Sequence, residues 1–360
     1  MIVMYSFSAD TNNVPSAISS QMVIVDENGN TIVPHHVKVI QSRMAEASTF
    51  EATLSLPQTT LEVPFFSNGE SITIYMVVSE TGQIEDYSKS KVFSGGIDRS
   101  IFNLADRTLK IWGRDWSSKL ISYELSGESF LNMTASDVIS SLAKTVGLSA
   151  DVDNTAGFVG QFYQYEHKAH GLSGMHRYQT AWDLCVGIQR NYGYDLWVDD
   201  KTVHFKKPSN DNVVSLSWNG NSGSSSFASG PILNLTLSHD LLYADNIYVA
   251  VSSWDSRQKI THKAIYPTES SSGQAFNFTA PVGTTIDQCK QIAQQRYGEI
   301  IAHTKNVEMH LHPYVNISTR QMVKLSGTNT VFDSVFYTVD QLSIEGTDRG
   351  ISKTAILRPR

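Results

Sequence analysis

The stretch of sequence that decides the fold lies between residues 92 and 115. It opens with Val-Phe-Ser-Gly-Gly-Ile-Asp-Arg at residues 92–99 and continues to Leu-Lys-Ile-Trp-Gly-Arg-Asp at residues 109–115. Both segments are rich in aliphatic and aromatic residues that favour strands. Beyond residue 118 the chain changes to helical patterns, and it later returns to strands. This order predicts an α/β module set between two β-rich halves.

Two helices are predicted in the module, at residues 134–146 and 180–191, because each begins with a capping box and continues with an apolar stripe. The capping pairs are Thr134 with Asp137 and Thr180 with Asp183, and the helices end at Gly147 and Gly193. A hairpin is predicted at residues 194–205, with Asp199 and Asp200 in its turn. The two helices and the hairpin should fold as one small α/β unit.

Short strands are predicted on both sides of this unit. Residues 49–56 show the pattern clearly, because Phe50, Ala52, Leu54 and Leu56 alternate with polar residues. The other strands are predicted at residues 22–25, 31–33, 37–40 and 71–78 before the unit, and at residues 232–238, 246–251, 307–312 and 336–344 after it. A third helix begins at Thr285, with Gln288 in the capping-box position. Short strands with Gly- and Asn-rich turns indicate a sandwich or a barrel.

The composition excludes several classes of protein. Of the 360 residues, 41% are hydrophobic and 18% are charged, which is typical of globular domains and argues against disorder. The net charge of −7 argues against a surface that clamps nucleic acid. No apolar run of about 18 residues occurs, and the N-terminus lacks a signal-peptide pattern, so no membrane span is expected. Cys185 and Cys289 occupy apolar positions of predicted helices, which favours buried thiols over a disulfide or a metal site.

The sequence carries no catalytic signature. The glycines at residues 95 and 96 lack the Lys and Ser/Thr of a phosphate-binding loop, and residues 171–174 lack the order of a nucleophile elbow. The adjacent carboxylates Asp199 and Asp200 are interpreted as turn formers. We therefore assign no catalytic, cofactor-binding or metal-ligating residue.

Histidines suggest a metal site at two places, and in both the sequence favours another interpretation. His167, His170 and His176 lie in a polar segment at residues 151–179 in which only Glu166 adds a ligand. A loop that faces solvent or a partner is the favoured interpretation there. His310 and His312 share one strand face and are interpreted as an exposed or interface stripe. Residues 219–230 have the composition of a flexible linker.

With these pieces in order, the chain resembles the central hub proteins of phage tail baseplates, the family of contractile-phage hubs and late control D-like tail proteins. Residues 92–98 are similar to a strand of the family's first barrel, and residues 111–120 to its Gly-Arg-Asp element. Residues 133–148 match the helix that follows, and residues 180–205 match a helix-hairpin unit. Residues 337–357 are similar to the closing strands of the second barrel.

The resemblance implies an α+β fold, mainly β, with two tail-tube-like antiparallel β-barrels and an inserted small α/β domain. It places the first barrel at residues 1–118, the insert at residues 119–215, and the second barrel, with a helix near residues 286–302, at residues 216–360. Three such chains offer six barrels, so a homotrimer adapts a hexameric tail tube to a trimeric spike or tip. The implied protein is a structural, non-enzymatic part of the virion tail baseplate, assembled in the cytoplasm of the bacterial host.

The implied partners are two further copies of the chain, the tail tube or distal tube protein, the spike or tip protein and the tape measure protein. DNA would pass through the lumen without sequence-specific binding, and no cofactor is implied. Because the sequence ends at residues 358–360 without an appended spike domain, we expect that a separate spike or tip protein is recruited or that the hub is closed in another way. Three copies at −7 each suggest the hypothesis of an acidic lumen that repels DNA phosphates.

Two other functions are carried as alternatives. A carbohydrate- or receptor-binding virion protein would need Trp218 and Trp254 to form a sugar platform. A cell-wall hydrolase domain of a tail tip would need an unrecognised active site. Glycan pulldown tests the first alternative, and loss of peptidoglycan turbidity tests the second.

Overall fold

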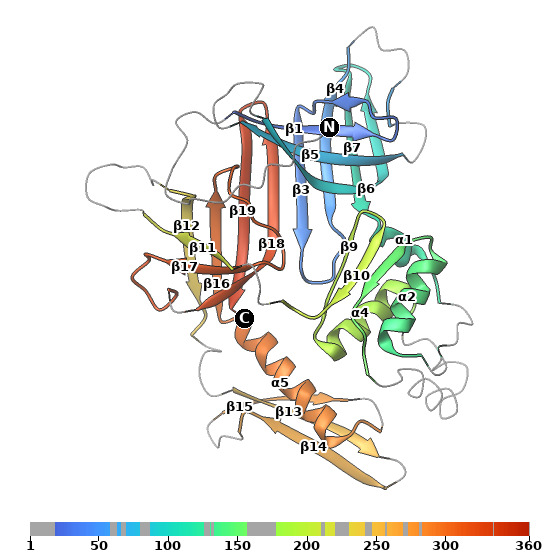
Figure 1. Ribbon diagram of the computed structural model, residues 1–360, viewed down its shortest axis with the longest axis vertical. Coiled ribbons are helices and arrows are strands. Elements are labelled where there is room, and N and C mark those ends of the chain that lie inside the picture. Colours follow the sequence, from blue (N-terminus) through green and yellow to red (C-terminus); the bar gives the residue numbers. More distant parts are fainter. Residues whose placement is uncertain are drawn as a thin grey trace.

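The computed structural model describes residues 19–57, 63–65, 70–79, 87–125, 130, 133–156, 178–209, 213–219, 230–241, 247–255, 258–268, 273–280, 283–333 and 335–359. The fold is mainly β, as predicted (Figure 1). Two β-rich halves lie side by side in the upper part of Figure 1. An α/β insert lies below the first half, and a small sheet with one helix lies below the second.

The first half contains the predicted strands before residue 118. The segment at residues 92–99 belongs to one long strand that continues in both directions. The strands are β1 (Ser19–Asp26), β2 (Thr31–Ile32), β3 (His36–Ser42), β4 (Thr49–Ser55), β5 (Ser71–Ser79), β6 (Tyr87–Asn103) and β7 (Thr108–Asp115).

The insert has the two predicted helices and the predicted hairpin. Both capping boxes are formed, and Gly193 ends the second helix with a φ of 67°. A short helix after β7 and a strand that pairs parallel to the hairpin were not predicted. The elements are α1 (Ser117–Ser122), α2 (Ala135–Thr145), β8 (Ser149–Val152), α4 (Ala181–Tyr192), β9 (Asp195–Asp199) and β10 (Thr202–Lys206).

The remainder of the chain forms two units with separate apolar clusters. The second half contains β11 (Val214–Ser217), β12 (Ile232–His239), β16 (Lys305–Leu311), β17 (Met322–Ser326), β18 (Phe336–Thr347) and β19 (Gly350–Pro359). The lower sheet contains β13 (Ile247–Asp255), β14 (Ile260–Tyr266) and β15 (Gln274–Thr279), and α5 (Ile286–Ala302) packs on one of its faces. Thr285 and Gln288 form the predicted capping box of α5.

One thirteen-stranded sheet joins the two halves within the described residues. Its central part is a run of eight strands in the order β12-β16-β19-β18-β3-β4-β7-β6, and we call it the eight-strand run. The halves meet inside the run, where β18 pairs antiparallel with β3. The buried residues of both halves belong to one hydrophobic cluster, so the halves are fused through sheet and core together.

Each half contributes four strands to the run in the same spatial order. The order β3-β4-β7-β6 in the first half corresponds to β12-β16-β19-β18 in the second. A bulge skips Asp98 in the pairing of β6 with β7, and a bulge skips Asp340 in the pairing of β18 with β19. Each of these aspartates forms an ion pair with an arginine of the neighbouring strand, Arg114 or Arg358. The two halves are therefore an internal structural repeat.

The glycines in the opening stretch are explained by the close packing of β6 on β7. A Cβ at Gly113 would clash with the carbonyl oxygen of Gly96 and with the ring of Phe50, and one at Gly95 would clash with the carbonyl oxygen of Arg114. Glycine at these positions lets β6 bend across β7 where the bulge increases the local twist. The ring of Phe93 then packs on Phe50, with 4.9 Å between the centroids.

Candidate functional site

The two ends of the eight-strand run are open strand edges. In the described part of the chain, β12 pairs with β16 alone, and residues 99–103 of β6 pair with β7 alone. Every pairing in the run is antiparallel, so the eight strands leave β12 and β6 pointing in opposite directions. Open edges present rows of N–H and C=O groups to another strand. The β6 edge of one copy could therefore continue the sheet onto the β12 edge of another.

Large apolar side chains are exposed beside both edges. Leu233 in β12 is 45% exposed, and Leu241, two residues beyond the end of β12, is 72% exposed. Ile101 on β6 is 41% exposed, and Leu104 in the turn that follows is 78% exposed. Exposed apolar residues gathered at two edges favour a surface that another protein covers.

The face of the run that points away from the core carries balanced charge. One row of cross-strand neighbours reads Glu345, Lys38, Glu51, Trp112 and Arg99 from β18 to β6. On the described strands of this face, Lys38, Arg99 and Lys110 are offset by Glu51, Glu308 and Glu345. Arg114 and Arg358 are paired with Asp98 and Asp340. The excess negative charge of the chain therefore lies elsewhere than on this face.

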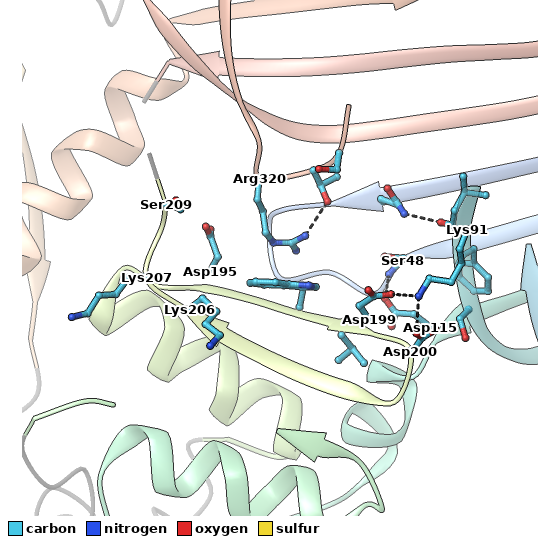
Figure 2. Close-up of a pocket in the computed structure, with 18 of the residues that line it drawn as sticks. Ser48, Lys91, Asp115, Asp195, Asp199, Asp200, Lys206, Lys207, Ser209 and Arg320 are labelled. Atoms are coloured by element: carbon cyan, nitrogen blue, oxygen red, sulfur yellow. Dashed lines mark hydrogen bonds and ion pairs between the residues drawn. The ribbon is translucent and has the colours of Figure 1, made fainter. Parts of the chain in front are cut away.

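Arg320 joins both halves to the insert (Figure 2). Arg320 lies in the loop between β16 and β17, and its backbone has a φ of 72°. The guanidinium donates to the carbonyl oxygens of Ser42, at 3.0 Å, and Leu196, at 3.4 Å. It also lies over the ring of Trp197, 4.7 Å from the centroid. Burial lowers the pKa of Arg320 to about 10, which marks the desolvation cost of placing a cation at this junction.

A partly buried ion network lies beside Arg320, with its aspartates more deeply buried than its arginines. Nε of Arg43 donates to Oδ1 of Asp195 at 3.0 Å, and Nη1 of Arg43 lies 3.5 Å from Oδ1 of Asp340. Nε of Arg358 lies 3.2 Å from Oδ2 of the same Asp340. Burial raises the pKa of Asp340, and the two arginines oppose this shift. The network links the insert, the first half and the second half through alternating charges.

A cavity of about 620 Å³ lies where the three parts meet. Lys91 of β6 reaches across it to the hairpin turn, with Nζ 3.0 Å from Asp199 and 2.7 Å from Asp200 (Figure 2). The two aspartates thus form the predicted turn and also bind the first half. Lys206 binds Asp153 on another side of the cavity. Lys91 therefore ties the first half to the insert, whereas the pair of Lys206 and Asp153 lies within the insert.

The described residues hold no cluster of three or more His, Cys, Asp or Glu side chains that could bind a metal. Cys185 and Cys289 are both buried and free, as predicted. The three histidines of the segment at residues 151–179 lie outside the described residues, as do residues 220–229 of the predicted linker. No helix in the described parts of the chain is long and apolar enough to cross a membrane.

The aromatic and histidine residues singled out in the sequence have ordinary structural contacts. Trp218 packs against the main core, whereas Trp254 on the lower sheet is 48% exposed. The structure therefore does not bring the two tryptophans together on one surface of the same unit. Nδ1 of His310 and the hydroxyl of Thr354 share a hydrogen bond of 3.0 Å. The ring of His312 stacks on the ring of Tyr314.

Sequence reasoning missed the open edges and the Arg320 junction. A short internal signal was present: Ile97-Asp98 and Val339-Asp340 each precede an arginine near the end of an alternating strand, Arg114 after 16 residues and Arg358 after 18. A search for internal repeats starts from such a pair. Arg320 had no comparable signal, because a polar residue in a loop shows no periodicity.

The geometry defines a class: a mainly β protein with two fused, repeated β halves, a small α/β insert and a separate sheet covered by one helix. No protein-family model matches the chain. No curated protein matches it either.

Solved structures show which proteins share this fold. The 43 kDa tail protein of a Shewanella oneidensis prophage has a TM-score of 0.68 and 14% identity, over 94% of this chain and 98% of that one. A tail protein from Neisseria meningitidis has a TM-score of 0.68 and 15% identity, over 95% and 96% of the two chains. An Escherichia coli component of the type VI secretion system has a TM-score of 0.53 and 7% identity, over 96% and 77%. The predicted resemblance to tail baseplate hubs is thus confirmed as a likeness of fold.

Proposed function

We propose that this protein is a structural hub of a phage tail baseplate, acting as a homotrimer that joins a hexameric tail tube to a trimeric spike or tip. The observation that carries the proposal is the pair of open, oppositely directed edges at the two ends of the eight-strand run. Head-to-tail contact between these edges is heterologous, and a rotation that closes it produces a ring.

The internal repeat supports three copies. Each chain supplies two halves of the same strand order, so three chains supply six similar units. The end of the ring formed by these six halves would have near-sixfold symmetry and would match the symmetry of a hexameric tube. The insert and the lower sheet occur once in each chain, so the side on which they lie keeps threefold symmetry (Figure 1). One chain type would therefore present two symmetries to two partners.

The dimensions of such a ring suit a channel for DNA. Eight strands from each of three chains give a ring of about 24 strands, and at about 4.8 Å per strand its circumference is roughly 115 Å. The backbone diameter is then about 37 Å before strand tilt, which widens it. Side chains on the inner face leave a bore of roughly 25 Å, which admits a DNA duplex. The tape measure protein would occupy the same channel before DNA passes.

The proposal is tested by the mass of the purified chain in solution. We expect a trimer, and images of it should show six lobes at one end and three at the other. Leu233→Asp places a charge on the β12 edge and should dissociate the trimer. Ile260→Asp is the matched control, since Ile260 has the same 45% exposure but lies on the lower sheet. A monomer at every concentration, or equal effects of the two substitutions, would contradict the proposal.

A further inference from the structure

The junction between the two halves of one chain is a template for the junction between two chains. Where the halves meet, β18 pairs with β3 in a fixed register: Gln341 opposite Ser42, Ser343 opposite Ile40, and Glu345 opposite Lys38. These strands are the last and the first strands of their halves in the eight-strand run. The open edges are the corresponding strands of the opposite halves, β6 and β12.

The bulges fix which residues of β6 and β18 correspond. Asp98 and Asp340 are the skipped residues, so Arg99 corresponds to Gln341, Ile101 to Ser343, and Asn103 to Glu345. The pairing on the next strand agrees, because Trp112 lies opposite Arg99 as Ile356 lies opposite Gln341.

The rows across the sheet fix which residues of β3 and β12 correspond. Trp112, Glu51 and Lys38 form one row in the first half. Ile356, Glu308 and Thr236 form the same row in the second half. Lys38 therefore corresponds to Thr236. Because β12 is regular from Asn234 to its end, Ser42 corresponds to Asp240 and Ile40 to Ser238.

We infer that the β6 edge of one chain pairs with the β12 edge of the next in this same register, with Arg99 facing Asp240. In the same register Ile101 lies opposite Ser238, and Asn103 lies opposite Thr236. The inference rests on the proposed ring and adds its register and its charged contact. The partner it names is a second copy of this chain.

The chemistry of the two edges suits this register. Arg99 is exposed, and its guanidinium lies 5.8 Å from the centroid of the Trp112 ring on the neighbouring strand β7. Asp240 is exposed just beyond the end of β12. Opposite charges in directly facing positions stabilise an antiparallel pair, whereas like charges destabilise it. A shift by two residues would place Arg99 opposite Ser238 and lose the contact.

Cysteine cross-linking tests the register. Ile101→Cys with Ser238→Cys should give a covalent trimer with a short thiol cross-linker. Ile101→Cys with Asn234→Cys is the off-register control and should give little. Native Cys185 and Cys289 are buried and should not react. Efficient cross-linking of the control pair instead would overturn the inference.

Charge reversal tests the contact itself. Arg99→Asp alone and Asp240→Arg alone should each raise the concentration at which half of the trimer dissociates by about tenfold or more, because each creates three like-charge contacts per ring. Combining the two should restore the wild-type value, and Lys290→Glu, on the exposed side of α5, should leave it unchanged. If the wild type forms a trimer but the double variant is not rescued, the register is overturned and the proposed ring still stands. A wild-type chain that forms no trimer would instead contradict the proposed function.

Discussion

The guanidinium of Arg320 lies 4.7 Å from the centroid of the Trp197 ring, and this contact fastens the second half of the chain to the insert. His204 stacks on Trp197 at 4.7 Å between ring centroids. Arg320 also reaches Ser42 of the first half. The contact of Arg320 with this indole is thus one of the contacts that hold the insert against the two halves.

Replacing Trp197 with leucine should therefore lower the free energy of unfolding by about 2–4 kcal/mol, because a buried cation loses its aromatic partner and a gap remains. Urea unfolding followed by far-UV circular dichroism measures the change. Trp112→Leu is the matched control: Trp112 also lies under an arginine, but Arg99 is exposed, so the loss should be less than about 1 kcal/mol. Equal losses for the two variants would contradict the role given to Trp197.

The exposed face of the eight-strand run bears on how DNA would pass through the proposed ring. The acidic composition of the chain suggested a repelling lumen, but the charges on this face are balanced. Glu51 and Glu308 occupy corresponding positions in the two halves. In the ring they would place six carboxylates among the lysines and arginines of the wall.

Removing these carboxylates should convert the wall into a surface that binds polyanions. Glu51→Gln combined with Glu308→Gln should bind a fluorescent linear duplex at low salt, with an affinity that falls steeply as salt rises. The wild-type trimer should not bind the duplex. Glu46→Gln combined with Asp287→Asn removes the same charge from exposed positions outside the face and should behave as the wild type. Binding by the control as strong as by the wall variant would show that net charge, and not the wall, governs the contact.

The sequence predicted those parts of the fold that depend on neighbouring residues. The helices α2, α4 and α5 were predicted because each has a capping box within four residues, whereas α1 is six residues long and has no side-chain cap. β14 and β15 were missed because much of each is exposed and neither shows a buried alternation. The pairing of β18 with β3 joins residues about three hundred positions apart, and no local pattern encodes such a contact. The open edges follow from that pairing, so they too required the structure.

Lys353 gives the second half a pH dependence. It is buried in β19, and its Nζ donates to the carbonyl oxygens of Val315, at 2.8 Å, and Pro313, at 3.2 Å. Burial lowers the pKa of this amine to about 8. Between about pH 8 and pH 10.5 the unfolded chain therefore binds more protons than the folded chain, and stability contributed by this group rises with pH in that window.

The difference in unfolding free energy between the wild type and Lys353→Met isolates this group. It should be constant below about pH 8 and should then shift in favour of the wild type by roughly 2–3 kcal/mol up to pH 10.5. Urea titrations at half-unit steps of pH measure it, with Lys290→Met as an exposed control that should show no such shift. A difference that stays flat through the window would mean that Lys353 keeps the pKa of a solvated lysine.

Gly96 in the first segment of the fold-deciding stretch and Gly113 in its second segment allow a test of the β6 edge itself. A Cβ at Gly113 would meet the backbone oxygen of Gly96 and the ring of Phe50, whereas a Cβ at Gly96 would meet open space. Gly113→Ala should therefore cost about 3 kcal/mol of unfolding free energy, because β6 must move away from β7. Gly96→Ala should change it by less than about 0.5 kcal/mol. Since residues 99–103 follow directly on this crossing, Gly113→Ala should also weaken trimer formation at concentrations where the chain remains folded, and Gly96→Ala should not. Equal urea midpoints for the two variants would mean that β6 and β7 are not packed as closely as their glycines indicate.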